Sequence, residues 1–236
     1  MQSAAVDDEG SLLASVFLCV LCVSAVCFLQ VLCVKFFLSE MKLILASASP
    51  RRAEILRNAG IAFETRAALL DESRRPGELR ADYVRRLALG KARAVANAEQ
   101  DSGDRLYLGA DTIVVAGDEI LGKPSSEEDA RRMLRLLSGA VHEVHTGVAL
   151  VRRPGAMEGL IEEITRVTFA PLSDDDIEGY IATGEPFDKA GAYAIQGIGG
   201  RYITRIEGCY FNVMGLPLAR LWSFLRDFGW RESVPD

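Results

Sequence analysis

The residues best suited to chemistry lie where a short apolar run ends. The stretch LILASASPRR, residues 43–52, passes from apolar residues directly to Ser47 and Ser49, and then to Arg51 and Arg52. Serine hydroxyls, the free N–H groups of a helix start and a planar guanidinium all favour an anion. The stretch therefore predicts one half of a phosphate site, although each residue is also typical of an ordinary helix start.

Charged residues break the apolar pattern at three other places. Asp111 interrupts the strand-like run LGADTIVV. An unpaired buried carboxylate is costly, so it must find a cation, take up a proton or line a wet cleft. Lys91 follows Leu87 by four and Val84 by seven, on the core face of a predicted helix, and Lys123 in GKP ends a strand. Ordinary roles stay open, since Asp111 could cap a turn and Lys91 could extend to solvent.

Glu72, in LLDESRR, adds a second carboxylate. With Asp111 it could hold a hard cation such as Mg²⁺ or Mn²⁺, because such ions bind one or two carboxylates together with substrate phosphates. The whole set suits metal-assisted attack on a polyphosphate. Serine nucleophile chemistry fits less well. His142 and His145 are three apart on a predicted strand, so they face opposite sides and neither is an evident base.

Strand and helix signals alternate from Met41 onward, which is typical of an α/β domain. Gly117 and Asp118 mark a hairpin, and Ser125 with Glu128 resembles a helix-capping box. Strands are predicted over 43–47, 61–65, 106–116, 119–122, 145–153, 162–170 and 201–208, and helices over 50–59, 82–98, 128–137, 173–183 and 217–228. Residues 184–200 are glycine-rich and are predicted to form a loop region.

Charge and cysteine content limit the partners. A net charge of −6 argues against nucleic acid, which needs clustered Lys and Arg, but not against a small phosphorylated ligand. Of five cysteines only Cys209 lies beyond residue 40. No disulfide framework is therefore expected, and a reducing compartment is the default.

The first 40 residues leave three interpretations open. Residues 11–34 carry no charge and as a helix would span about 36 Å, enough for a bilayer. The segment could precede the natural start at Met41, or it could be an anchor whose flanking charges keep the body in the cytoplasm. It could also be a secretory signal, which the acidic residues 7–9 disfavour. A cytoplasmic body is expected, with a membrane partner only if residues 11–34 are an anchor.

Several linked motifs resemble those of one known family. SASPRR, GADTIV, LGKP, TGVAL and GEPFDKAGAYAIQGIGG, in this order and spacing, resemble the Maf nucleoside triphosphate pyrophosphatases over about residues 41–230. The resemblance implies an α/β fold of the Maf/ITPase-like kind, a mixed twisted sheet with flanking helices and a deep central cleft. It implies a pyrophosphatase domain over residues 41–232 that follows a hydrophobic extension, residues 1–40. It also implies hydrolysis of a nucleoside triphosphate to the monophosphate and diphosphate with a divalent metal cation.

The resemblance implies roles for individual residues. Asp111 matches the catalytic acid/base, and Glu72, Lys91 and Lys123 match charged residues of the cleft. The residues expected to bind substrate are Ser47, Ser49, Arg51, Arg52, Lys91, Thr112, Lys123 and Gln196, and those expected to bind metal are Glu72 and Asp111.

Three of these positions mark substrate preference in the family. Arg51, Thr112 and Gln196 resemble the branch that hydrolyses dTTP and UTP and so clears surplus pyrimidine nucleotides. The Gln196 amide could match the O4/N3–H edge of a pyrimidine, or it could bond loop backbone. The alternatives are a 7-methyl-GTP pyrophosphatase and a septum-formation regulator that binds nucleotide without turnover. A homodimer is among the assemblies open to such a protein.

Overall fold

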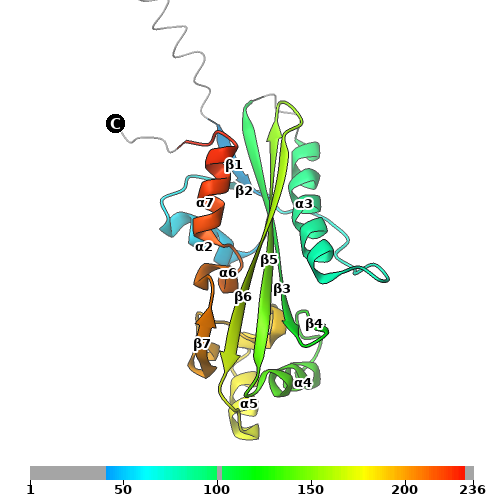
Figure 1. Cartoon of the computed structure of the whole chain (residues 1–236), viewed down its shortest axis with the longest axis vertical. Helices are drawn as coiled ribbons and strands as arrows, with labels where there is room; N and C mark the ends of the chain where they lie inside the picture. Colours follow the sequence, from blue (N-terminus) through cyan, green and yellow to red (C-terminus); the bar gives the residue numbers. More distant parts are fainter. Residues whose placement is uncertain (1–40, 100–102, 232–236) are drawn as a thin grey trace, which may run out of the picture. The chain divides into compact units, whose positions relative to one another are not determined.

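A seven-stranded mixed sheet organises the chain (Figure 1). The computed structural model describes residues 41–99 and 103–231. The strand order in the sheet is β2-β1-β3-β5-β6-β7, and β4 pairs with the carboxyl-terminal end of β3. The strands are β1 Lys42–Leu45, β2 Glu64–Thr65, β3 Arg105–Ala116, β4 Glu119–Leu121, β5 Val141–Arg153, β6 Glu158–Phe169 and β7 Ile203–Glu207. The predicted α/β class and mixed sheet are confirmed.

Helices cover both faces of the sheet. In Figure 1, α3 lies on one side of the long central strands, and α2, α6 and α7 lie on the other. The helices are α2 Pro50–Asn58, α3 Arg80–Ala98, α4 Glu127–Leu137, α5 Asp174–Ile181, α6 Tyr210–Met214 and α7 Leu218–Asp227, with 3₁₀ turns η1 Glu185–Asp188, η2 Ala190–Ala192 and η3 Ile198–Tyr202. None of the described helices is long and apolar enough to cross a membrane.

Alternation along the first half of β3 divides its side chains between two cores. Leu106 and Leu108 pack with α2 and α7 residues such as Ile55 and Leu221. Tyr107, on the opposite face, packs with α3 residues of the other core. Because successive strand residues face opposite sides, Asp111 lies on the α3 face and Thr112 on the α2 face.

Two glycines bring the α3 backbone directly onto the sheet. A Cβ added at Gly109 would lie 2.1 Å from the carbonyl oxygen of Ala88, and one at Gly147 would lie 2.7 Å from that of Val84. Gly109 precedes Asp111 by two on the same strand face, and Gly147 is the cross-strand partner of Asp111. The two close approaches therefore fix how far α3 stands from Asp111.

Several predicted boundaries change in the structure. The predicted strand 61–65 is only β2, and β5 begins at Val141, before the predicted start. The α4 cap is Ser126, whose hydroxyl accepts the Asp129 N–H, whereas Ser125 bonds the Asp129 carboxylate. The predicted pairing of Ser125 with Glu128 is wrong, because Glu128 bonds the Ser126 side chain instead. Helix α6 was not predicted, because five residues between turns give too little periodicity.

The predictions for residues 1–40 lie outside the described residues. The chain divides into two units, Met1–Glu40 and Met41–Asp236. The proposed extension and its role therefore stay predictions.

Replacing Gly109 by alanine should destabilise the protein by about 3 kcal/mol or more, because the new methyl group would collide with helix backbone that cannot move alone. Gly179→Ala is the matched control. A Cβ at this α5 position meets nothing within 4 Å, and alanine is the better helix former, so a gain of roughly 0.5–1 kcal/mol is expected. Urea unfolding measures both, and wild-type stability of Gly109→Ala would contradict the packing account.

Candidate active site

A gap along one edge of β3 opens into a cleft. β1 pairs with β3 only as far as Leu108, and β4 begins to pair at Val114. Among the described strands, none pairs with the intervening β3 residues on that edge. The cleft measures about 530 Å³ and is lined from α2, α3, the β4–α4 connection, η1–η2 and α6. The predicted deep cleft is thus present, and it lies where a parallel neighbour ends.

An ion-paired triad occupies the α3 side of the cleft. The Lys91 ammonium donates to Asp111 Oδ1 at 2.7 Å and lies 2.8 Å from Glu72 Oε1. Asp111 is 7% exposed and Lys91 9%, whereas the Glu72 side chain is 59% exposed. Asp111 has therefore found a cation and does not cap a turn, and the Lys91 amine is directed to the carboxylates.

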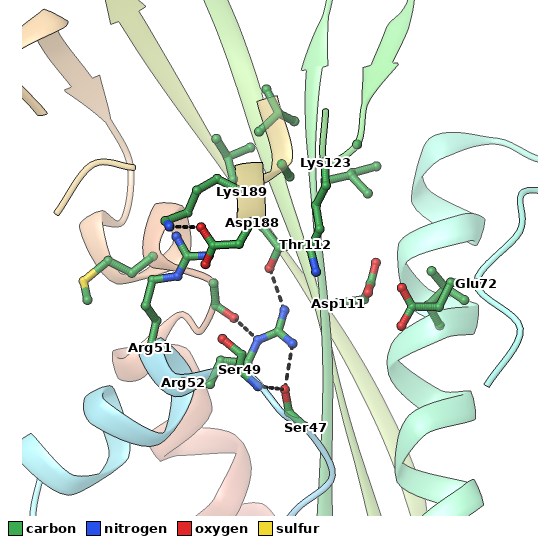
Figure 2. A pocket seen from close by; sticks show the side chains of 18 of the residues that line it. Ser47, Ser49, Arg51, Arg52, Glu72, Asp111, Thr112, Lys123, Asp188 and Lys189 are labelled. Carbon is green, nitrogen blue, oxygen red and sulfur yellow. Dashed lines mark hydrogen bonds and ion pairs between the residues drawn. The ribbon is translucent and has the colours of Figure 1, made fainter. Parts of the chain in front are cut away.

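The segment that carries Glu72 is tied to α3. Tyr83 Oη donates to the Glu72 carbonyl at 2.8 Å, and Tyr83 itself lines the cleft. In Figure 2, Glu72 and Asp111 lie on the α3 side, opposite Ser47 and Arg52. Tyr83 was not predicted, because one tyrosine on a helix carries no sequence signal of function.

Burial raises the pKa of Asp111 above its usual range, and the nearby charges of Lys91 and Arg52 offset only part of that effect. Glu72 adds to the rise through its negative charge. A carboxylate with a raised pKa in a cleft is suited to accept a proton from a ligand.

Arg52 ties the opposite side of the cleft together. Its Nε donates to the Gly215 carbonyl at 2.8 Å, Nη1 to Ser47 Oγ at 3.1 Å and Nη2 to Thr112 Oγ1 at 3.0 Å. The side chain is buried, and burial lowers its pKa, although a guanidinium stays charged at neutral pH. Arg52 thus fixes α2, β3 and the end of α6, and its predicted contact with substrate stays a prediction.

Three further cationic side chains line the cleft. Arg51 and Lys123 both line it, and neither has an ion-pair partner among the described residues. Lys189 also lines it and is ion-paired with Asp188 (Figure 2). Asp188 and Lys189 were missed as site residues, although they stand in the quoted motif GEPFDKAG.

The two serines are placed differently. Ser47 Oγ is buried and accepts both Arg52 and the Ser49 N–H, the latter at 3.2 Å. Ser49 occupies the start of α2, but its side chain makes no capping bond. Both line the cleft, so the predicted anion-binding half faces the charged triad across the same cleft.

Gln196 lies outside the lining of the cleft. It is exposed, and its Nε2 donates to Glu54 Oε1 at 3.3 Å. Its loop is held by Glu185, whose carboxylate accepts the Ile198 and Gly199 N–H groups, each at 3.0 Å. The role of Gln196 in choosing a substrate stays a prediction.

The histidines take no part in the site. His142 bonds Tyr193 Oη at 2.8 Å through Nε2, and burial lowers its pKa to about 4, so it is neutral near pH 7. His145 lies on the other strand face between Glu162 and Glu143. Their placement on opposite faces and their packing roles are as predicted.

The predicted metal ligands meet at one point. Within residues 41–99 and 103–231, no group of three or more His, Cys, Asp or Glu is arranged to hold a metal ion. Glu72 and Asp111, however, converge on the single ammonium of Lys91, so the position between them already attracts a cation. Two carboxylates fit Mg²⁺, which completes its coordination with water and substrate phosphates.

Comparisons with known proteins place these residues in a family. The family model described as Maf-like protein matches residues 42–228. A dTTP/UTP pyrophosphatase of Hahella chejuensis is 50% identical over 188 residues, covering 80% of this chain and 92% of the relative. One from Anaeromyxobacter sp. is 53% identical over 191 residues, with 80% and 90% covered. One from Koribacter versatilis is 52% identical over 190 residues, with 80% and 95% covered.

Solved structures give a weaker likeness. A nucleoside-triphosphatase / dITP/XTP pyrophosphatase from Mycobacterium abscessus aligns with a TM-score of 0.37 and 16% identity, over 80% of this chain and 98% of that one. A likeness at this level supports no conclusion about function.

Removing the charge of Lys91 and removing the charge of Glu72 should shift the pKa of Asp111 in opposite directions. Lys91→Met removes a charge that lowers the pKa of Asp111, so that pKa should rise further. Glu72→Gln removes a charge that raises it, so the pKa should fall. Carbon-13 NMR titration of the labelled Asp111 carboxyl measures both shifts.

Arg93→Gln is the matched control, because Arg93 is on the same helix but pairs with Glu158 outside the cleft. It should leave the Asp111 titration unchanged. A lower pKa of Asp111 in Lys91→Met would show that the ammonium does not stabilise the carboxylate.

Proposed function

This chain belongs to the Maf family, and from that premise we propose that it is a nucleoside triphosphate pyrophosphatase that hydrolyses dTTP and UTP. The products are the nucleoside monophosphate and diphosphate. One observation carries the proposal: the Lys91–Asp111–Glu72 triad and the cations Arg51 and Lys123 line the same cleft. The names of the curated relatives support this substrate pair over 7-methyl-GTP.

The reaction needs a water molecule, a base and compensation of negative charge. Water attacks the α-phosphorus, a P–O bond forms, and the bond from the α-phosphorus to the bridging oxygen breaks. Asp111 accepts the proton of the water, for which its raised pKa suits it. Lys91 holds the carboxylate in place, and Arg51 and Lys123 stabilise charge on the departing diphosphate.

A divalent cation fits this cleft. Asp111 and Glu72 are the residues that would hold it, because both already contact one cationic group, the Lys91 ammonium. When bound, such an ion neutralises phosphate charge and polarises the phosphoryl group. A binding protein without turnover would have no need of a buried base, which favours the enzyme over a purely regulatory role.

The proposed activity would act on nucleotide pools of the cytoplasm. The described residues contain a single cysteine, Cys209, which is free, as suits a reducing compartment.

Asp111→Asn should lower kcat for dTTP by at least about 100-fold, because an amide cannot accept the proton. The fold should persist, since asparagine has nearly the same shape and size. The measurement is diphosphate release from dTTP and UTP with Mg²⁺ or Mn²⁺, together with a thermal unfolding curve.

The control is Asp175→Asn, at an exposed α5 position outside the cleft, which should keep wild-type turnover. Wild-type turnover by a folded Asp111→Asn variant would show that Asp111 is not the base in the reaction. Release of orthophosphate in place of diphosphate from the unaltered protein would refute the proposed reaction.

A further inference from the structure

A chain of hydrogen bonds leads from the cleft into the protein. Arg52 Nη2 lies 3.0 Å from Thr112 Oγ1, which lies 3.0 Å from Thr146 Oγ1. Thr146 Oγ1 is in turn 3.2 Å from the carbonyl oxygen of Asn212. Thr112 lines the cleft, but Thr146 and Asn212 are fully buried behind it. Thr146 therefore influences a ligand only through Thr112.

The first and last groups in this series of hydrogen bonds, Arg52 and the Asn212 carbonyl, set the direction in which the two threonine hydroxyls donate. A guanidinium can only donate, and a backbone carbonyl can only accept. When Thr146 donates to Asn212 and Thr112 donates to Thr146, both hydroxyl protons have acceptors. In the reverse order Thr146 donates to Thr112, and the Thr112 proton then has no acceptor among the described residues. The first order is favoured, because it keeps the donation of the buried Thr146 hydroxyl to Asn212 and gives the Thr112 proton an acceptor within the protein.

With its proton directed to Thr146, Thr112 offers the cleft only a lone pair. A hydroxyl oxygen has two acceptor positions, and Arg52 occupies one of them. Any ligand atom that bonds Thr112 Oγ1 must therefore be a donor.

The Thr112 side of the cleft carries charge from Arg51, Arg52 and Lys189, and it also offers apolar surface on which a base can lie. Val144, Tyr193, Val213 and Met214 line the cleft on this side and present apolar surface. The carboxylates and Lys91 lie across β3, on its α3 face. A flat ring can therefore lie against these apolar side chains next to Thr112, while the phosphates reach Lys91 on the α3 side and the cations Arg51 and Lys123.

We infer that Thr146 is a positioning residue for substrate choice, because it holds Thr112 as an acceptor that selects bases with a ring N–H over bases with an unprotonated ring nitrogen. Uracil and thymine carry a donor at N3, whereas cytosine carries an acceptor there. The inference rests on the proposed function in taking a nucleoside triphosphate as the ligand. It adds the buried residue that distinguishes UTP from CTP.

The test compares binding of two uncleavable nucleotides. The α,β-methylene analogues of UTP and CTP are titrated calorimetrically, with Mg²⁺, into the full chain and its Thr146→Val and Thr146→Ser variants. The unaltered protein should prefer the UTP analogue. Thr146→Val removes the acceptor for the Thr112 proton, so this preference should fall by roughly 10-fold. Thr146→Ser keeps the hydroxyl and should retain the preference.

The ratio of the two affinities separates a change in base recognition from a general structural effect, because partial misfolding would weaken the binding of both analogues alike. If Thr146→Val does not fold, Thr146→Ala takes its place and the same ratio decides. An unchanged ratio in the folded Val or Ala variant overturns the inference, as does failure of the unaltered protein to bind or to discriminate the two analogues.

Failure of the proposed function gives a different result. If the protein binds the UTP analogue with a Thr146-dependent preference but does not hydrolyse UTP, the role of Thr146 stands and the proposed activity is wrong. If it hydrolyses UTP with a preference that does not depend on Thr146, the proposed activity stands and the role of Thr146 is wrong.

Discussion

The structure of the cleft depends on one buried ion pair, between Lys91 and Asp111, and on the spacing that makes it possible. A buried carboxylate without a partner is expensive, and an ammonium placed among apolar residues is equally costly. Gly109 and Gly147 let α3 approach the sheet closely enough for the two groups to meet at 2.7 Å. The same approach places Glu72 and Tyr83 over the cleft. The packing of α3 on the sheet therefore sets the geometry of the site.

The cleft has two chemically different sides because β3 presents alternate residues to opposite faces. Asp111 belongs to the charged α3 side, and Thr112, the next residue, belongs to the side that Arg52 ties together. The gap between β1 and β4 exposes both sides at one edge. A nucleoside triphosphate can therefore contact the carboxylates and Lys91 on one side, and Thr112 with the apolar side chains near it on the other.

Much of this arrangement could be predicted from sequence, because it follows from local rules. Asp111 breaks an apolar strand, which made a cation partner one of its predicted outcomes, and Lys91 breaks an apolar helix face, which marked it as unusual. The structure pairs the two. The bonds of Arg52 could not be predicted, since Gly215 lies 163 residues away along the chain and its carbonyl carries no sequence signal. The placement of Gln196 outside the cleft lining depends on how Glu185 folds a glycine-rich loop, which periodicity does not describe.

A crystal structure with Mg²⁺ and the α,β-methylene analogue of UTP tests the central claim most directly, because that claim concerns where a triphosphate lies. The account predicts the α-phosphate beside Asp111 and Lys91, the terminal phosphates against Arg51 and Lys123, and the uracil N3–H on Thr112 Oγ1. Phosphates bound away from Asp111 and Lys91, or a base on the α3 side of the cleft, would contradict it.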